Sequence, residues 1–127
     1  MNTARILQQE KEAPYPQTLL RPCRAITGIS AILLPYNNNN SVDWASFERT
    51  LEHTVSAGLI PAVNMDTGYA SLIDEATRLE VLQRTSAVTS GLEFVAGVFV
   101  GDSPGQKFDA DAYRHGITET EAASGTP

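Results

Sequence analysis

The stretch "DWASFERTLEHTVSAGLIPAVNM", residues Asp43 to Met65, decides the fold because it joins a helical pattern directly to a strand pattern. Asp43 is typical of a helix N-cap. Mostly apolar side chains follow at spacings of three, four, three and one, as on one face of an amphipathic helix: Trp44, Phe47, Leu51, Thr54 and Val55. Gly58 should end the helix. The apolar run that follows predicts a short buried strand.

Strand and helix patterns of the same kind occur on both sides of this stretch. The segment "ITGISAILLP" is apolar, β-branched and ended by Pro35, which predicts a strand buried on both faces. After the second strand, Ser71 or Asp74 should open a helix that runs to Gly91. The segment "LEFVAGVFV" predicts a third strand, "GDSPGQK" a loop, and a last helix follows.

The predicted order is therefore β-α-β-α-β-α, with no hairpin signal between the strands. Strands are expected at Ile26 to Leu34, Leu59 to Asn64 and Phe94 to Val100, and the last helix should begin at Asp109 or Asp111. Such an order is typical of the α/β class, with parallel strands linked by helices. Residues 1–25, which include a possible helix from Thr3 to Glu12, are interpreted as an N-terminal extension, and residues 26–127 as one domain of three β-α units.

Composition limits the classes of function. The chain has 127 residues, 42% of them hydrophobic, and a formal net charge of -6, which argues against nucleic-acid binding because phosphates require clustered Lys and Arg. Cys23 is the single cysteine, so no intrachain disulfide is expected. No apolar run is long enough for a membrane span or has the form of a secretory signal, so a cytoplasmic protein is expected.

The loop "MDTGY", from Met65 to Tyr69, is the strongest candidate for a site. In parallel sheets the loops that leave the carboxyl ends of strands carry function. Asp66 and Tyr69 are predicted catalytic residues, and Thr67, Gly68 and Asp102 are predicted to bind substrate. The alternative is a plain turn, in which Asp66 accepts backbone hydrogen bonds and Gly68 adopts a positive φ angle. His53 and His115 are interpreted as surface or interface histidines.

The chain resembles the N-terminal half of the dihydrodipicolinate synthase and N-acetylneuraminate lyase family. The resemblance runs from about Ile26 to Asp102 and rests on five segments in order: "GISAILLPY", "VDWASFERTLEHTVSAG", "DTG", "LIDEATRLEVL" and "FVAGV". It implies the N-terminal part of a (β/α)8 TIM barrel. It also implies a lyase or aldolase that forms a lysine Schiff base with a 2-oxo acid and needs no cofactor or metal.

The sequence departs from that family at two points. In the loop that holds the substrate carboxylate, Thr67 and Gly68 match the family pattern, whereas Met65, Asp66 and Tyr69 do not. An acid at position 66 would repel an anionic substrate unless it is protonated or bound to a metal. The family's catalytic tyrosine and lysine belong to later strands, so this chain is expected to be an N-terminal half that lacks the Schiff-base lysine.

Three hypotheses about function remain open. The first is a lyase or aldolase that acts on a small carboxylate or carbonyl compound. The second is a metal-assisted enzyme that uses Asp66 and Asp102. The third is a non-catalytic remnant or assembly module. The expected partners are a small-molecule substrate and further copies of the chain, because apolar edge strands without Lys or Pro in mid-strand favour a homo-oligomer.

Overall fold

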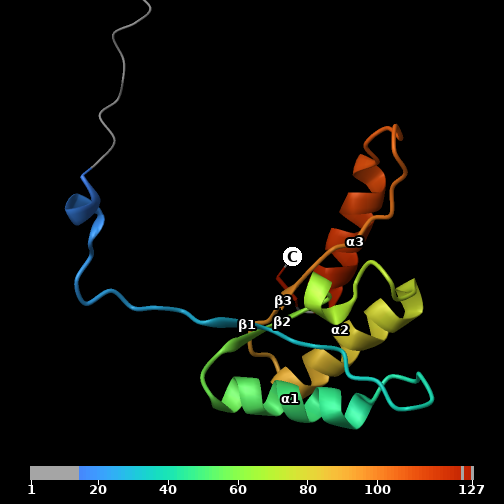
Figure 1. The fold of residues 1–127 in the computed structure, drawn as a ribbon, viewed down its shortest axis with the longest axis horizontal. Coiled ribbons are helices and arrows are strands. Elements are labelled where there is room, and N and C mark those ends of the chain that lie inside the picture. Colours follow the sequence, from blue (N-terminus) through green and yellow to red (C-terminus); the bar gives the residue numbers. More distant parts are fainter. Residues whose placement is uncertain (1–14, 124, 127) are drawn as a thin grey trace, which may run out of the picture.

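Three short strands and three α-helices alternate along the chain in the computed structural model, which describes residues 15–123 and 125–126 (Figure 1). The elements are η2 (Pro16–Leu19), β1 (Ile29–Ala31), α1 (Trp44–Ser56), β2 (Ile60–Val63), η3 (Asp66–Gly68), α2 (Glu75–Thr89), β3 (Val95–Ala96) and α3 (Ala110–Ala122). The order agrees with the predicted β-α repeat. The helix predicted from Thr3 to Glu12 lies outside the described residues.

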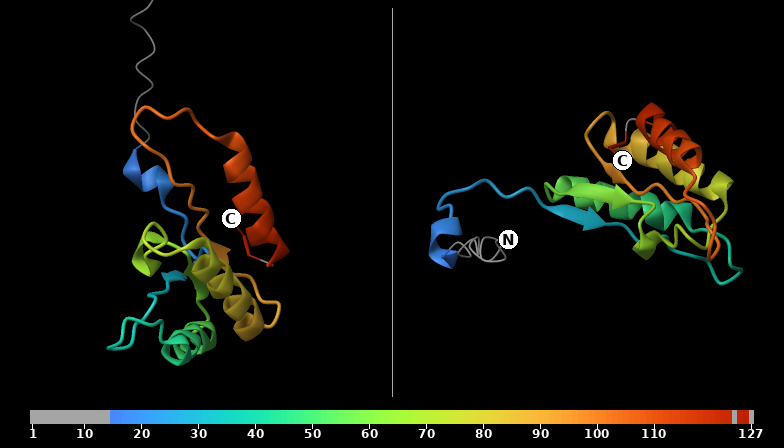
Figure 2. Two further views of the ribbon diagram at one scale, coloured as in Figure 1. Left: turned by 90° about the vertical axis from the view of Figure 1, so that its right-hand side faces the viewer. Right: turned by 90° about the horizontal axis from the view of Figure 1, so that it is seen from above.

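The strands form one parallel sheet in the order β1-β2-β3. Ile29 pairs with Ile60, and Ala62 pairs with Val95. Helices α1 and α2 connect neighbouring strands and cover the sheet (Figure 2). The prediction of three parallel strands is confirmed, and the carboxyl ends of all three strands lie at the same edge of the sheet.

Each strand is shorter than its apolar run predicts, and at the carboxyl ends pairing stops where the central strand turns away. Asn64 follows β2 with a φ angle of 52°, in the left-handed region. Asparagine tolerates this region better than most residues. Beyond Val63, β1 and β3 therefore no longer have β2 as a pairing partner. The last ladder bond on the β3 side is donated by the Gly97 amide to the Val63 carbonyl, at 2.9 Å.

The helix ends follow the capping signals in the sequence. Asp43 caps α1 by accepting a hydrogen bond from the Ser46 amide, and Asp74 caps α2 in the same way. Side-chain hydrogen bonds from Ser46 and Thr77 lower the pKa of Asp43 and Asp74, because a carboxylate that accepts such bonds is favoured in its charged form. Asp109, one of the two predicted caps, caps α3.

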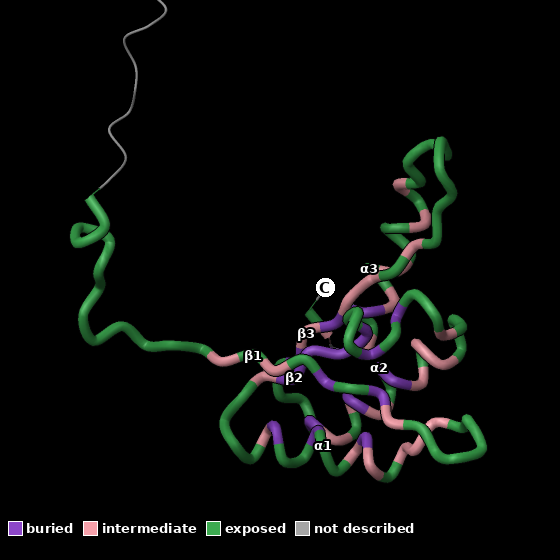
Figure 3. The backbone as a smooth tube through the Cα atoms, in the orientation of Figure 1, coloured by how far each residue is buried: buried purple, intermediate pink, exposed green. Residues whose placement is uncertain are grey.

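The hydrophobic core lies between the sheet and the helices α1 and α2 (Figure 3). Ile32 and Leu34, which follow β1, are buried, as are Phe47 and Leu51 of α1. The remaining core members are Val63, Val81, Leu82, Phe94 and Ala96. Burying these apolar side chains is the main source of stability.

The other face of the first strand is open, so the prediction that it is buried on both faces is wrong for this structure. Ile29 is 57% exposed and Leu33 is 61% exposed, although both are apolar. Side chains alternate across a strand, so these positions point away from the helices that cover Ile32 and Leu34. In a closed (β/α)8 barrel this face would point to the interior of the barrel.

The two ends of the described chain differ in how they meet the sheet. Residues 15–27 are exposed and lead away from the helices and strands (Figure 1). Thr126, by contrast, lies beside β3 in a parallel bridge with Val95. Its amide donates to the Phe94 carbonyl at 2.8 Å, and its carbonyl accepts from the Ala96 amide at 2.9 Å. The backbone after α3 thus continues the parallel sheet order.

Candidate functional site

The turn that follows β2 carries most of the predicted site residues. Residues Asp66, Thr67 and Gly68 make the short helix η3, in which the Gly68 amide donates to the Met65 carbonyl at 2.9 Å. Gly68 is buried, and a Cβ atom there would lie 3.4 Å from the Ile32 carbonyl oxygen. A Cβ atom at this position would therefore be in van der Waals contact with the backbone that follows β1. The turn is seated directly on the sheet.

Tyr69 ends this turn in the left-handed conformation, with a φ angle of 60°. The alternative reading of the loop placed a positive φ angle at Gly68, and in the structure it falls on Tyr69 instead. A bulky residue in this region is uncommon and is held there by its surroundings. The Tyr69 amide donates to the Asp66 carbonyl at 3.0 Å, and the Ile73 amide donates to the Tyr69 carbonyl.

The loop after β1 packs against this turn through an aromatic pair. Tyr36 and Tyr69 pack with ring centroids 6.0 Å apart and planes tilted by 57°. This separation lies within the range of a favourable aromatic pair. Tyr36 is 44% exposed and Tyr69 is 43% exposed, so both residues are partly accessible to solvent. Hydrogen bonds between Asn37 and Ser41 close the turn that follows Tyr36.

Arg78 of α2 holds the segment that follows Tyr69. Its Nη1 donates to the carbonyls of Ala70 at 3.1 Å and Ile73 at 2.6 Å. The guanidinium also lies over the Phe99 ring, 5.4 Å from its centroid, in a cation–π arrangement. Charged donors make hydrogen bonds stronger than those between neutral groups. The loop is therefore anchored to α2 at one end and to β2 at the other.

The predicted site residues are brought together only in part. Asp66 and Thr67 are exposed at the carboxyl end of β2, and within the described part of the chain their side chains make no hydrogen bond. Their oxygens are therefore accessible to a ligand. Asp102 lies in the exposed loop between β3 and α3, and the group of described residues with metal-ligand geometry contains neither Asp66 nor Asp102. The metal-assisted alternative based on these two acids is not favoured.

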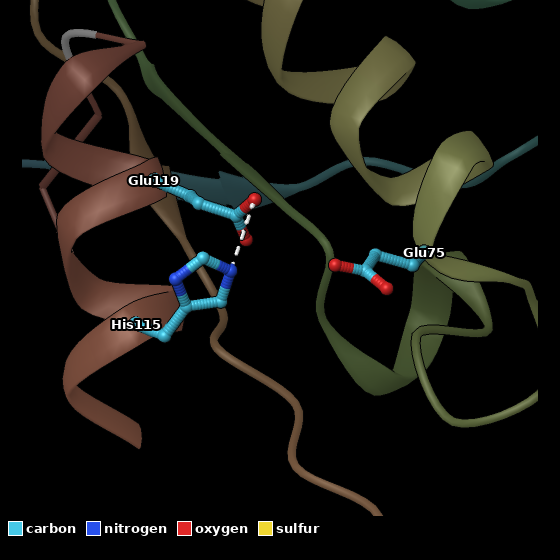
Figure 4. Close-up of side chains that lie close together, drawn as sticks. All are labelled: Glu75, His115 and Glu119. Atoms are coloured by element: carbon cyan, nitrogen blue, oxygen red, sulfur yellow. Dashed lines mark ion pairs between the residues drawn. The ribbon is translucent and has the colours of Figure 1, made fainter. Parts of the chain in front are cut away.

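A second group of chemically active side chains lies between α2 and α3 (Figure 4). Glu75, His115 and Glu119 place one potential ligand atom each within 4.8 Å of one another. Among residues 15–123 and 125–126, no other group of three or more acids, histidines or cysteines brings its ligand atoms this close together. This group was not predicted from the sequence. The i,i+4 spacing of His115 and Glu119 was a visible signal, but the opposing Glu75 depends on helix packing.

Lys107 does not have the setting of a Schiff-base lysine. It lies in the exposed loop before α3, and its neighbours Gln106 and Phe108 are exposed as well. A lysine becomes neutral near pH 7 only through burial or a neighbouring cation. Lys11, the other lysine of the chain, lies outside the described residues.

The fold is similar to that of a known enzyme structure. A solved structure of a monomeric dihydrodipicolinate synthase variant matches with a TM-score of 0.63 and 19% sequence identity. The match covers 80% of this chain and 33% of that chain, so this chain spans about a third of the length of the matched protein. No family model and no curated protein sequence matches the chain. In the described part, no helix is long and apolar enough to cross a membrane.

The match concerns the fold, since 19% identity is too low to carry function. The three parallel strands and three helices correspond to the N-terminal part of a (β/α)8 TIM barrel. The predicted fold class is therefore confirmed. The chain has a dihydrodipicolinate synthase-like fold, and the loop from Asp66 to Tyr69 lies at the carboxyl-end rim, where enzymes of this architecture carry their active sites.

Proposed function

We propose that this chain forms the carboxylate-binding rim of a dihydrodipicolinate synthase-like lyase or aldolase that acts on a 2-oxo acid or a related carbonyl compound. The observation that carries the proposal is the turn Asp66–Gly68, which exposes a carboxylate and a hydroxyl beside the paired rings of Tyr36 and Tyr69. Hydroxyl and phenol donors suit a substrate carboxylate or a carbonyl oxygen.

Each residue of the turn has a separate role in this proposal. The Thr67 hydroxyl donates to the substrate carboxylate, and the buried Gly68 allows the turn to rest on the sheet. The Tyr69 phenol donates to the carbonyl oxygen. The Asp66 carboxylate accepts a hydrogen bond or a proton from the substrate. Asp102, on the next loop, contributes to binding at the rim.

Asp66 also narrows the class of substrate. An ionised carboxylate repels a second anion, but it attracts a hydroxyl or ammonium donor. A carbonyl compound with a hydroxyl or amino group near the carbonyl therefore fits the rim better than a plain 2-oxo acid does. The proposal gives neither lysine of the chain a catalytic role. It concerns only the binding of substrate by the turn after β2.

The test is a titration of the isotope-labelled chain with pyruvate and with hydroxypyruvate, followed by amide NMR. The amides of residues 66–69 should shift saturably, and hydroxypyruvate should bind more tightly. Thr67→Val should weaken binding of both compounds about tenfold or more, since a hydrogen bond to a charged group contributes roughly 1.5–3 kcal/mol. Asp66→Ala should abolish the preference for hydroxypyruvate and leave the fold intact.

The matched control is Thr50→Val, which removes the same hydroxyl from the exposed face of α1. Its affinity for both compounds should equal that of the unmodified chain. Equal losses in Thr67→Val and Thr50→Val, or shifts that avoid residues 66–69, would overturn the proposal.

A further inference from the structure

The helices α2 and α3 face each other across a pocket of about 210 Å³. Its walls come from the first turns of α2, the middle of α3 and the segment that follows β3. Glu75 enters from one side, and His115 and Glu119 enter from the other (Figure 4). The pocket is separate from the loop Asp66–Tyr69, none of whose residues lines it.

The three side chains have donor atoms suited to a divalent transition metal. His115 Nε2 lies 3.6 Å from Glu119 Oε1, one helical turn away on α3. All three candidate donor atoms lie within 4.8 Å of one another. Two ligand atoms bound at about 2.1 Å to a tetrahedral ion lie about 3.4 Å apart. Small side-chain rotations would therefore bring the three atoms onto one ion.

Asn64 is a buried polar residue that lines the same pocket. It is 6% exposed. Its Nδ2 donates to the Arg78 carbonyl at 3.1 Å, which fixes the orientation of the amide. Its Oδ1 is buried and has no hydrogen-bond partner among the described residues. A buried acceptor without a partner is rare and is commonly explained by a bound water or ion.

The charges around the pocket favour a cation of charge +2. Glu75 and Glu119 bring two negative charges when ionised, and a neutral His115 brings none. Arg78 also lines the pocket, but its guanidinium is engaged by two loop carbonyls and by the Phe99 ring. One imidazole and two carboxylates form a ligand set that zinc accepts, with a remaining position for solvent.

We propose that Glu75, His115 and Glu119 form a binding site for Zn²⁺ or a similar divalent transition metal, which ties α3 to α2. Thr120 is the single buried residue of α3 (Ala110–Ala122). This helix therefore buries little apolar surface of its own. An ion with ligands on both helices supplies a cross-link that hydrophobic packing does not. The proposal does not depend on the proposed function of the rim.

The experiment is a calorimetric titration of the full chain, prepared without a polyhistidine tag, with Zn²⁺ alone. One ion per chain should bind, and a chelator should reverse the binding. His115→Ala should weaken binding at least tenfold, whereas His53→Ala, which removes the other histidine of the chain, should not change it. Glu119→Gln should weaken binding, whereas Glu121→Gln, on an exposed position of the same helix, should not.

A second measurement reports the cross-link directly. Zn²⁺ should slow amide hydrogen exchange in residues 110–122, and it should not do so in His115→Ala. Circular dichroism of the metal-free variants checks that they fold like the parent chain. Absence of saturable binding, or equal effects of His53→Ala and His115→Ala, would overturn the proposal. Binding without slower exchange in α3 would overturn the cross-link.

Discussion

Gly97 is the position at which a single methyl group should do most harm to the sheet. A Cβ atom there would lie 2.3 Å from the Asn64 carbonyl oxygen and 3.1 Å from its carbonyl carbon. Both are backbone atoms, so no side-chain rotation relieves the overlap. Normal contact between carbon and oxygen requires about 3.3 Å. Gly97→Ala must therefore move the backbone segments at Gly97 and Asn64 apart by about 1 Å.

This movement removes a hydrogen bond as well as causing strain. The Gly97 amide donates to the Val63 carbonyl at 2.9 Å, and an extra 1 Å takes the pair beyond hydrogen-bonding distance. The lost bond costs about 1 kcal/mol and overpacking about 1–3 kcal/mol. We expect Gly97→Ala to lower the free energy of unfolding by about 2–4 kcal/mol, which is a large share of the usual 5–15 kcal/mol.

The assay is urea denaturation, followed through the helical circular dichroism signal and the fluorescence of Trp44. The matched control is Gly101→Ala, whose added Cβ would meet nothing closer than the Phe99 ring at 3.8 Å. Its free energy of unfolding should stay within about 0.5 kcal/mol of the parent value. All proteins are measured at one concentration, because association shifts apparent stability. Equal denaturation midpoints for Gly97→Ala and Gly101→Ala would refute the close approach of Gly97 to Asn64.

Three further predictions concern pH, chemistry and assembly. The pKa values of Asp43 and Asp74 are lowered in the folded chain, so their stabilisation is present above the unfolded pKa of about 4 and is lost as pH falls through the folded pKa. On acidification, the melting temperature of the double variant Asp43→Asn/Asp74→Asn, which keeps both cap acceptors, should therefore fall less than that of the parent. An equal fall of melting temperature with pH in both proteins would contradict this. Borohydride reduction with pyruvate should leave the mass of the chain unchanged, because Lys107 is exposed in a polar loop; an adduct mapped to Lys107 would show that the chain carries its own catalytic amine. The chain should elute as an oligomer in size-exclusion chromatography with light scattering, since Ile29 and Leu33 expose an apolar sheet face; a monodisperse monomer that melts cooperatively would count against this.

Much of the fold could be predicted from local signals. The caps at Asp43 and Asp74 and the glycines at positions 58 and 91 mark helix ends through hydrogen bonds and backbone angles that act within a few residues. The parallel order follows from helices placed between strands without hairpin turns. The position of Asp66 and Thr67 at a strand's carboxyl end follows from the same order.

Features that depend on residues distant in the sequence were decided only by the tertiary structure. The carboxyl-end limits of the strands follow from the turn at Asn64, whose effect on β3 acts through pairing and not through the sequence of β3. Exposure of Ile29 depends on whether anything covers that face of the sheet, which an apolar run cannot show. The meeting of Glu75 with His115 and Glu119 joins residues 40 or more positions apart. Local periodicity places each of them on its helix, but only the placement of α3 across the pocket from α2 brings their side chains together.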